Sequence, residues 1–381
     1  MILAFGFLIA LTGVCNYYIT KRLCQGIGYK VPSLPKWVGI VIFLLLTVLL
    51  TVGFFRTSLP ISLGLSNALG VINGYYLGIF VYLLLFFVLS DLVLLVLRLC
   101  KVIPKPLPQK TRAIAVLLSV VVALSTCCYG WVHVNQIQVE SYQVSLAPKK
   151  IEKEMKLVLL SDLHLGAAGW ETRLEKVVAK VSEQQGELIC IAGDIFDSNF
   201  HAMANPARAK ELLQSLYAPY GVYASLGNHD AGETFPQMVA FLKECNITLL
   251  DDKAVTIDNR LILAGRLDRS PIGGYGEYTR KPLGEVLEGQ NTALPVVMLE
   301  HNPAHGDSYS RTDADLILSG HTHKGQIFPA NLFTNFIYTE DYGYYQESEN
   351  HPHRIITSGA GIWGMPMRVG TNSEIVTVTL H

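Results

Sequence analysis

The segments Lys156-Leu-Val-Leu-Leu-Ser-Asp-Leu-His164 and Leu188-Ile-Cys-Ile-Ala-Gly-Asp194 each join a short apolar run to polar side chains. Runs of this kind, rich in Val, Ile and Leu, are typical of strands buried within a sheet. Further runs occupy residues 222–226, 261–264, 296–299, 316–319, 355–357 and 375–380. Helical patterns lie between the early runs, over 170–181 and 206–216. This alternation predicts an α/β domain with the sheet inside and the helices outside.

Polar motifs follow five of the predicted strands. They are Asp162-Leu-His164, Gly193-Asp194, Gly227-Asn-His-Asp230, His301 and Gly320-His-Thr-His323. In α/β folds, ligands collect at the edge formed by the carboxyl ends of the strands. Carboxylate and amide oxygens mixed with imidazole nitrogens suit hard and borderline divalent metals. A turn or a helix cap would explain any one motif alone, but the five together predict a metal site.

The first third of the chain is apolar. Hydrophobic residues make up 50% of the chain and charged residues 16%, a composition that excludes an ordinary soluble protein. Crossing a hydrocarbon core takes about 20 apolar residues. Four stretches are long enough: Ile2–Ile19, Trp37–Phe55, Leu77–Leu97 and Ala113–Val134. No Lys or Arg precedes the first stretch, which argues against a cleaved signal peptide.

We therefore predict a four-span transmembrane domain over residues 1–134, a linker over 135–155 and a globular domain over 156–381. The polar stretch that ends in Pro148-Lys149-Lys150 would be the tether. Asp91, in the third predicted span, is a candidate functional residue because an acid is costly there. We favour a role in helix packing for it. A single intramembrane charge and no Gly/Pro-broken pair of spans favour anchoring over transport.

Charge is distributed unevenly between the two parts. Residues 1–134 hold ten basic residues and one acid, which leaves twenty basic and thirty acidic residues for 135–381. Two loops between predicted spans are basic, with Lys21, Arg22, Lys30 and Lys36 in one and Arg98, Lys101, Lys105, Lys110 and Arg112 in the other. By the positive-inside rule both loops face the cytoplasm. This predicts a multi-pass cell-membrane protein whose globular domain is extracytoplasmic. Because the globular domain is net acidic and has no basic stripe, we expect no nucleic-acid partner.

The ordered set Asp-x-His, Gly-Asp-x-x-Asp, Gly-Asn-His-Asp, a lone His and Gly-His-x-His resembles the calcineurin-like metallophosphoesterases over residues 156–381. This resemblance implies a layered β-sandwich flanked by helices. Residues 320–329, Ser358-Gly-Ala-Gly361, Pro366-Met-Arg368 and Glu374-Ile-Val376 are similar to a membrane-associated bacterial branch, often called YkuE-like or YaeI-like. Lys324 and Ser373 depart from that branch, which usually has Gly and Pro there. Neither departure is at an implied ligand, and Lys324 would bear on substrate preference.

The resemblance also implies ligands for two divalent metal ions. One ion would be held by Asp162, His164, Asp194 and His323, and the other by Asp194, Asn228, His301 and His321, with Asp194 bridging. In such sites the two cations lie about 3.5–4 Å apart, and the water between them loses a proton near neutral pH to attack phosphorus. Mn, Fe, Zn and Mg all fit this mixture of oxygen and nitrogen ligands. No other cofactor is implied.

His229 follows the implied ligand Asn228 and is expected to stabilise or protonate the leaving oxygen, with Asp230 orienting its ring. A helix cap for the run beginning near Thr234 is the alternative for Asp230. Asp197 is expected to support a ligand or a turn rather than to bind metal. His201 and His353 lie in loops that could face the site. The remaining histidines, His133, His305, His351 and His381, are expected at the surface or in loops.

Two segments are candidates for substrate recognition. Arg266, Arg269, Arg280 and Lys281 bracket Gly273-Gly-Tyr-Gly276 and would either grip a phosphate or form a solvated loop. Residues 328–345 are rich in aromatic side chains and would either line an apolar groove beside the bilayer or serve the core. The aromatic residues are Phe333, Phe336, Tyr338, Tyr342, Tyr344 and Tyr345, and Trp363 and Met365 would extend the same surface.

We predict a membrane-anchored dinuclear-metal phosphoesterase that hydrolyses a phosphoester or diphosphate bond. The membrane anchor favours a lipid-linked substrate such as a phospholipid, a polyprenyl phosphate or a lipid-linked sugar nucleotide, with small soluble phosphodiesters as an alternative. The lipid A enzyme that cleaves UDP-2,3-diacylglucosamine shares the metal motif, but the predicted topology argues against a cytoplasmic substrate. A membrane receptor or scaffold that only binds phosphate is a further alternative, and the intact set of seven ligands argues against it.

Overall fold

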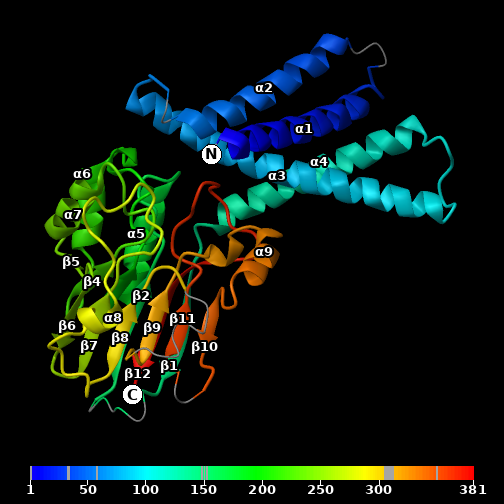
Figure 1. Cartoon of the computed structure of the whole chain (residues 1–381). Helices are drawn as coiled ribbons and strands as arrows, with labels where there is room; N and C mark the ends of the chain where they lie inside the picture. Colours follow the sequence, from blue (N-terminus) through cyan, green and yellow to red (C-terminus); the bar gives the residue numbers. More distant parts are fainter. Residues whose placement is uncertain are drawn as a thin grey trace. The chain divides into compact units, whose positions relative to one another are not determined.

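The computed structural model describes residues 2–31, 35–56, 59–146, 149, 151, 153–303, 313–348 and 351–381. It divides into two compact units, Met1–Trp131 and Val132–His381, which are described separately. Figure 1 shows the elements of both units coloured along the sequence.

The first unit consists of helices. They are α1 (Ile2–Ile27), α2 (Lys36–Phe55), α3 (Leu63–Leu99) and α4 (Gln109–His133). Within the described residues, α2 over Lys36–Gly53, α3 and α4 are long and apolar enough to cross a membrane. The first predicted span, Ile2–Ile19, falls in α1 and stays a prediction. Helix α3 has 37 residues and is therefore about 55 Å long, well beyond the 21 residues predicted for its span.

Asp91 joins two helices of this unit. Its Oδ1 lies 2.6 Å from Arg22 Nη2, and its Oδ2 accepts a hydrogen bond of 2.6 Å from Tyr18 Oη. Arg22 and Tyr18 both belong to α1, whereas Asp91 belongs to α3. An acid in a span is tolerated when it is paired in this way. The helix-packing role favoured for Asp91 is therefore confirmed.

The second unit contains two six-stranded sheets. The first has the order β1 (Ile137–Val144), β12 (Ser373–Leu380), β2 (Met155–Leu160), β3 (Leu188–Ala192), β4 (Val222–Ser225) and β5 (Thr248–Leu249). The second has the order β10 (Gly343–Tyr345), β11 (His353–Ile356), β9 (Leu316–Ser319), β8 (Val296–Leu299), β7 (Leu261–Gly265) and β6 (Lys253–Ile257). Strands β2 to β5 pair in parallel, as do β7, β8, β9 and β11. Both sheets also contain antiparallel pairs and are mixed.

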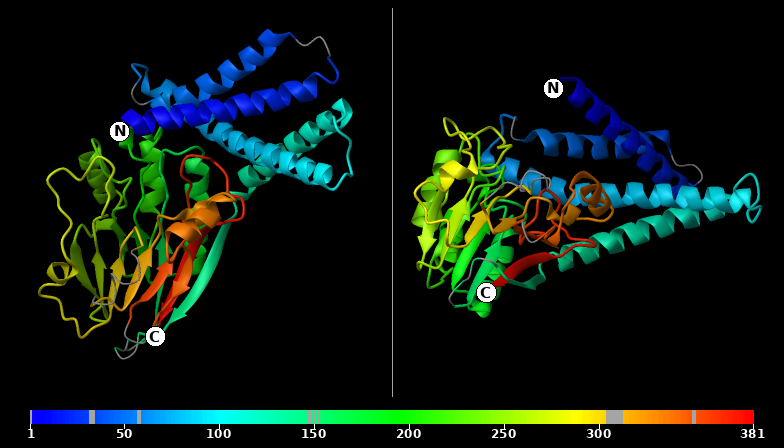
Figure 2. Two further views of the ribbon diagram at one scale, coloured as in Figure 1. Left: turned by 45° about the vertical axis from the view of Figure 1, so that its right-hand side comes forward. Right: turned by 60° about the horizontal axis from the view of Figure 1, so that its bottom comes forward.

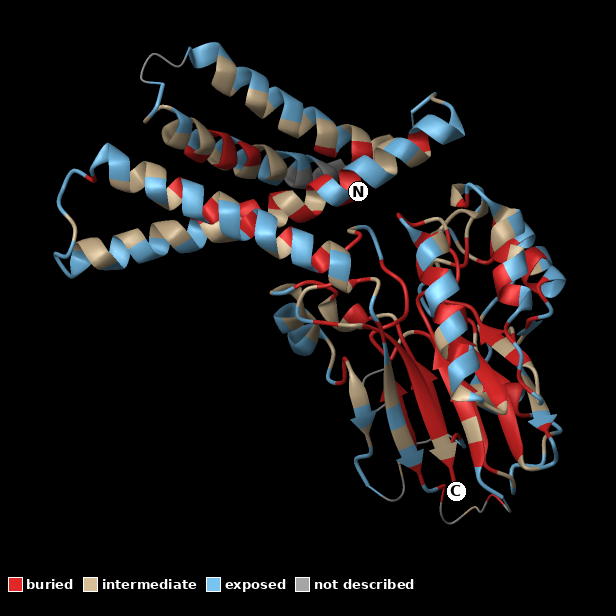
Figure 3. Cartoon of the chain, turned by 180° about the vertical axis from the view of Figure 1, so that it is seen from behind, coloured by how far each residue is buried: buried red, intermediate tan, exposed pale blue. Residues whose placement is uncertain are grey.

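Alternate residues of each central strand serve two different cores. Leu157 and Leu159 of β2 pack with Leu263 and Leu299 of the second sheet, in the core between the sheets. Val158 and Leu160, which point the other way, pack under α5 (Trp170–Gln184), α6 (Pro206–Gln214) and α7 (Phe235–Glu244). Helix α8 (Leu283–Val286) covers the far side of the second sheet. The central strands are thus buried on both faces (Figure 3), and the predicted α/β arrangement is confirmed.

The predicted linker over 135–155 contains a strand. Residues 137–144 form β1, which pairs in parallel with β12 from Ile137 opposite Ser373 to Val144 opposite Leu380. Its side chains are buried at both ends and exposed or half-buried between, which explains why this stretch has a polar sequence. Only residues 134–136 separate α4 from β1. Of the predicted tether, Pro148 and Lys150 lie outside the described residues, and Lys149 Nζ pairs with Asp315 Oδ2 at 2.8 Å.

Candidate metal centre

The five polar motifs meet where the carboxyl edges of the two sheets come together. Asp162 and Asp194 stand two residues after β2 and β3 in the first sheet, and His301 and His321 two residues after β8 and β9 in the second. Because β2 and β3 pair in register, with Leu160 opposite Ile191, the loops that follow them are neighbours. The Asp162 N–H donates to Gly193 O at 3.0 Å, which ties the two loops together.

The backbone of these loops is held in an unusual conformation. Asp162, His164, Asp194, His321 and His323 all have positive φ, between 45° and 72°. Non-glycine residues seldom adopt this region, and such strain gathers at functional sites. Glycine is required beside them because the loops approach closely. A Cβ on Gly227 would lie 2.1 Å from Asp194 Oδ1, and one on Gly320 would lie 2.3 Å from Asp162 Oδ2.

One candidate metal-ligand cluster consists of Asp162, His164 and His323, all buried. Asp162 Oδ1 lies 3.3 Å from His323 Nε2, and the Nε2 atoms of His164 and His323 are 3.2 Å apart. At least one of these nitrogens must present a lone pair, because two N–H groups cannot face each other at that distance. One cation between the carboxylate and the two rings would satisfy all three.

A second cluster consists of Asp194, His301 and His321. His301 Nε2 lies 3.1 Å from Asp194 Oδ2 and 3.2 Å from His321 Nδ1. On its other side, His301 Nδ1 is 2.8 Å from the carbonyl oxygen of Ala192, so Nδ1 carries a hydrogen and donates a hydrogen bond to it. This bond fixes the tautomer and leaves Nε2 free to bind a metal. Asp194 Oδ2 is also 3.7 Å from His164 Nε2, so this carboxylate touches both clusters.

Asn228 supplies independent support for a bound cation. Its amide oxygen is buried and has no hydrogen-bond partner among the described residues. Leaving such an acceptor unsatisfied costs about 1–3 kcal/mol, and native structures seldom do so. The next residue donates its backbone N–H to Asp194 Oδ1 at 2.8 Å, which holds the Asn228 loop against the second cluster. A divalent cation there would satisfy the oxygen, so the residues present fit the predicted metals.

Burial and neighbouring charge set the protonation of the ligands. Burial disfavours the charged form of every imidazole, yet Asp194 raises the pKa of His301 well above its usual value. Asp197 and Asp194 likewise outweigh burial and raise the pKa of His164. Burial lowers the pKa of His321 to about 4, with help from His301, and lowers that of His323 as well. The carboxylates thus favour the protonated forms of His164 and His301, and a bound cation would compete with those protons.

Two further residues hold ligands in place. Asp197 Oδ1 lies 3.5 Å from His164 Nδ1, where it orients the ring as carboxylates do for metal-binding histidines. Arg368 is fully buried and donates to the carbonyl oxygens of His323 at 3.1 Å and of Ser358 at 2.7 Å. Burial lowers the pKa of Arg368 to about 10. Asp197, His164 and His229 also form a third group that could hold a metal ion, so the supporting role expected for Asp197 stays a prediction. The role of Arg368 was not predicted.

Asp230 does not orient His229, contrary to our expectation. Its carboxylate accepts backbone hydrogen bonds from Ile195 at 3.1 Å, Phe196 at 2.8 Å and Gly227 at 2.9 Å. It therefore fastens the loop after β3 to the loop after β4. The group beside His229 Nδ1 is the Ser198 hydroxyl, which sequence spacing gave no reason to select. Burial lowers the pKa of His229, whose ring lies 5.0 Å from that of His164.

The two loop histidines singled out from the sequence have other surroundings. His353 lies in β11, where Tyr344 Oη is 2.6 Å from its Nδ1, and His201 is exposed in the short helix Phe200–Ala202. Neither belongs to a metal-ligand cluster found among the described residues. His133 Nε2 pairs with Asn372 Oδ1 at 3.0 Å, His351 Nδ1 with Ser348 Oγ at 2.7 Å, and His381 is exposed. His305 lies outside the described residues.

The three arginines proposed to grip phosphate converge on one buried acid. Glu300 is 1% exposed, and its carboxylate pairs with Arg266 at 3.4 Å, Arg269 at 2.9 Å and Arg280 at 2.5 Å. Glu300 immediately precedes His301. The cluster therefore fixes the end of β8 that presents this histidine. Lys281 contributes its backbone, since its carbonyl oxygen accepts from Arg266 at 2.8 Å.

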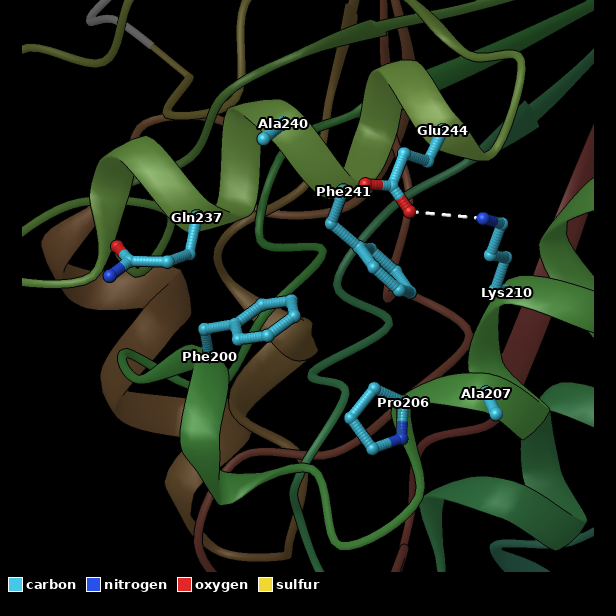
Figure 4. Close-up of a pocket in the computed structure, with 8 residues that line it drawn as sticks. All are labelled: Phe200, Pro206, Ala207, Lys210, Gln237, Ala240, Phe241 and Glu244. Atoms are coloured by element: carbon cyan, nitrogen blue, oxygen red, sulfur yellow. Dashed lines mark hydrogen bonds and ion pairs between the residues drawn. The ribbon is translucent and has the colours of Figure 1, made fainter.

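A separate hollow of about 420 Å³ lies between α6 and α7. Phe200, Pro206 and Phe241 line it, and Lys210 pairs across it with Glu244 at 3.0 Å (Figure 4). None of the predicted ligands and neither predicted catalytic residue lines this hollow. It is distinct from the metal centre.

Comparison with known proteins agrees with this geometry. The family model described as calcineurin-like phosphoesterase matches residues 155–325. An uncharacterized metallophosphoesterase of Campylobacter jejuni is 30% identical over 99% of this chain and 98% of its own length. A transmembrane protein with metallophosphoesterase domain from Danio rerio is 28% identical over 95% of this chain and 84% of its own length. The UDP-2,3-diacylglucosamine pyrophosphatase of Chlamydia trachomatis is 23% identical over 59% of this chain and 82% of its own length.

Proposed function

Since the chain belongs to the calcineurin-like metallophosphoesterase family, we propose that it hydrolyses the phosphoester or diphosphate bond of a lipid-linked substrate at the outer face of the cell membrane. The observation that carries the chemistry is the position of Asp194. Its carboxylate lies 3.1 Å from His301 and 3.7 Å from His164, and so touches both metal-ligand clusters. Such a shared carboxylate is what a site for two cations requires.

The proposed ligands are those expected from the sequence. Asp162, His164, Asp194 and His323 would hold one ion, and Asp194, Asn228, His301 and His321 the other. When bound, two divalent cations neutralise phosphate charge and generate a nucleophile from water near neutral pH. The chain itself fixes the ligands through Ala192 O on His301, Asp197 on His164 and Arg368 on His323.

His229 is proposed to hand a proton to the leaving oxygen. The Ser198 hydroxyl lies beside His229 Nδ1, which leaves Nε2 to face the substrate. His229 is partly exposed, whereas His164, with which its ring makes an edge contact, is fully buried. Burial lowers the pKa of His229, so its imidazolium is a stronger acid than usual, although less of it is present near neutral pH.

The proposed side of the membrane depends on two elements only. The loop between α3 and α4 carries Lys101 and Lys105, with Arg98, Lys110 and Arg112 at the adjoining helix ends. Basic loops favour the cytoplasm, and α4 is long and apolar enough to cross the membrane after it. The globular unit then follows on the outer side. Whether α1 also crosses does not alter this inference.

Two observations support a lipid-linked substrate. The chain combines apolar helices with the phosphoesterase domain, and one relative is named for a pyrophosphatase of a diacylated sugar nucleotide. That named reaction uses a nucleotide, which an extracytoplasmic domain would not meet. We therefore favour a lipid phosphate or diphosphate over a nucleotide-linked lipid.

The test is hydrolysis by the full-length protein in lipid nanodiscs, stripped of metal and then supplied with Mn, Fe, Zn or Mg. Substrates are bis-p-nitrophenyl phosphate, p-nitrophenyl phosphate and a panel of phospholipids and polyprenyl phosphates. We expect metal-dependent cleavage, lost in both Asp194→Asn and His229→Ala, with metal lost only from Asp194→Asn. Cleavage of soluble esters without any lipid phosphate would contradict the substrate class, and loss of metal from His229→Ala would contradict its role.

A further inference from the structure

Helix α9 (Ala330–Ile337) presents an unusual apolar surface for the outside of a globular domain. None of its residues is buried. Leu332, Phe333, Phe336 and Ile337 are 58%, 64%, 89% and 61% exposed. Phe328, just before the helix, and Trp363 are 46% and 55% exposed. We refer to these six side chains as the α9 patch. Single exposed apolar residues need no explanation, but a group of them in one part of a domain indicates an interaction surface.

The patch is concentrated in one part of the globular unit. Among its described residues from 133 onward, ten large hydrophobic side chains are exposed, and six of them belong to the patch. The others, Tyr217, Ile272, Tyr278 and Tyr344, are spread over other segments. The sequence predicted either a groove or a core role for residues 328–345. The structure places residues 330–337 in the exposed helix α9, whereas Tyr338, Tyr342 and Tyr345 are half-buried.

The α9 patch is anchored to the loop of residues 357–372. Gln326 Nε2 donates to the carbonyl oxygens of Trp363 at 2.9 Å and Met365 at 2.8 Å. The Phe328 N–H donates to Val369 O at 2.7 Å. In both views of Figure 2, α9 (orange) lies beside this loop (red). These hydrogen bonds hold Trp363 and the start of α9 in the same part of the domain.

The loop of residues 357–372 also contacts the chain at the end of α4. Val134 is 1% exposed and packs with Ala167 and Ile362. Its carbonyl oxygen accepts from Ser373 Oγ at 2.9 Å, and His133 pairs with Asn372 at 3.0 Å. Since only residues 134–136 lie between α4 and β1, this connection spans at most about 14 Å. The end of the domain that bears the α9 patch is thus the end tied to a candidate membrane span.

Two aromatic residues bring this part of the domain next to the metal centre: Trp363, which belongs to the patch, and Tyr338, which does not. The ring of Tyr338, which directly follows α9, lies 6.0 Å from that of His321. The ring of Trp363 lies 6.3 Å from that of His229. Apolar side chains therefore stand beside both the second cluster and the proposed proton donor. A phosphate held at the metal centre would lie within a side chain's length of this apolar border.

From these contacts we infer that the α9 patch inserts into the boundary between headgroups and acyl chains of the lipid bilayer. Amphipathic helices with large apolar side chains such as Phe and Leu on one face bind membranes in this way. The bilayer is the occupant because the patch is continuous with the loop that receives the chain from α4 across only residues 134–136. Insertion brings the metal centre to the level of the lipid phosphates. The inference goes beyond the proposed hydrolysis and does not require it.

Photo-crosslinking of the full-length protein in liposomes of phosphatidylethanolamine and phosphatidylglycerol tests the insertion. A benzophenone-bearing amino acid replaces Phe336, and in a matched control it replaces Tyr217, which is 81% exposed between α6 and β4. We expect phospholipid adducts from position 336 and none above background from position 217. Equal lipid labelling at both positions, or adducts of position 336 to a second copy of the chain or another protein, would overturn the inference. The readout needs no turnover, so it is independent of the proposed activity.

A second variant links the patch to lipid substrates and rests on the proposed function. Phe333→Asp combined with Phe336→Asp changes only exposed side chains and should leave metal-dependent cleavage of bis-p-nitrophenyl phosphate unchanged. Cleavage of a lipid phosphate in nanodiscs should fall at least about tenfold, because two inserted aromatic side chains are lost. Equal losses on both substrates would assign the patch a structural role and contradict insertion. If the wild type cleaves no lipid, the crosslinking result alone decides.

Discussion

Asp197→Asn should weaken metal binding at the cluster of Asp162, His164 and His323. Asp197 Oδ1 lies 3.5 Å from His164 Nδ1, and this nitrogen has no well-formed hydrogen bond among the described residues. The carboxylate also raises the pKa of His164, which means that it favours positive charge on that ring. Removing such an outer carboxylate costs about 10–100-fold in metal affinity. That range corresponds to about 1.4–2.8 kcal/mol.

Equilibrium dialysis of the metal-stripped full-length protein against Mn or Zn would measure the effect, with the bound metal counted by elemental analysis. At intermediate metal concentrations, Asp197→Asn should retain one ion where the wild type retains two, because His301 and His321 are not touched. Asp258→Asn is the matched control, since Asp258 pairs with Arg260 at 3.6 Å and with Tyr220 at 2.8 Å away from the centre. Two ions bound to Asp197→Asn with wild-type affinity would refute the reasoning. Loss far beyond 100-fold would indicate that Asp197 is itself a ligand.

Three other predictions address pH and stability. As pH drops through the raised pKa values of His301 and His164, metal affinity should fall by up to about tenfold per pH unit for each proton that the metal displaces. Equilibrium dialysis at several pH values would measure this slope. A metal affinity that does not change with pH would show that these rings are already neutral and contradict the prediction. Asp230→Ala should destabilise the globular unit by about 3 kcal/mol, because three buried backbone donors lose their acceptor; an unchanged thermal midpoint would contradict this. Glu300→Gln should destabilise the globular unit by about 3–5 kcal/mol, because Arg266 and Arg280 lose their buried counter-ion. Arg269→Gln should have a much smaller effect. Equal losses of stability in the two variants would contradict the central role of Glu300 in the cluster.

The sequence predicted the inner strands of both sheets but not the strands at their edges. Eight strands were predicted within about two residues of their ends, and all are interior or buried on both faces. The four that were missed are β1, β5, β6 and β10, which are the edge strands of the two sheets. An edge strand is exposed along one side, so its sequence lacks the continuous apolar run that marks a central parallel strand. β5 is in addition only two residues long.

The candidate site divides in a similar way. Six of the seven predicted ligands lie in clusters that could hold a metal ion, because their position after parallel strands fixes where they meet. The assignment of ligands to ions stays a prediction. The Asp230 carboxylate and the Ser198 hydroxyl could not be assigned from the sequence, since their partners depend on how two loops fold against each other. The arginines around Glu300 are a comparable case of pairing between separate segments.

The position of the α9 patch bears on how a lipid phosphate would reach the metals. A phospholipid keeps its phosphate at the interface and its chains in the hydrocarbon, so lifting it out of the bilayer exposes many CH₂ groups at about 0.8 kcal/mol each. A domain that places Trp363 and Tyr338 beside His229 and His321 avoids that cost if the patch is inserted, because only the headgroup must enter the centre. The anchor then contributes more than proximity. In the proposed arrangement the short connection through residues 134–136 keeps the α9 patch near the bilayer, and lengthening it should weaken insertion without altering the ligands.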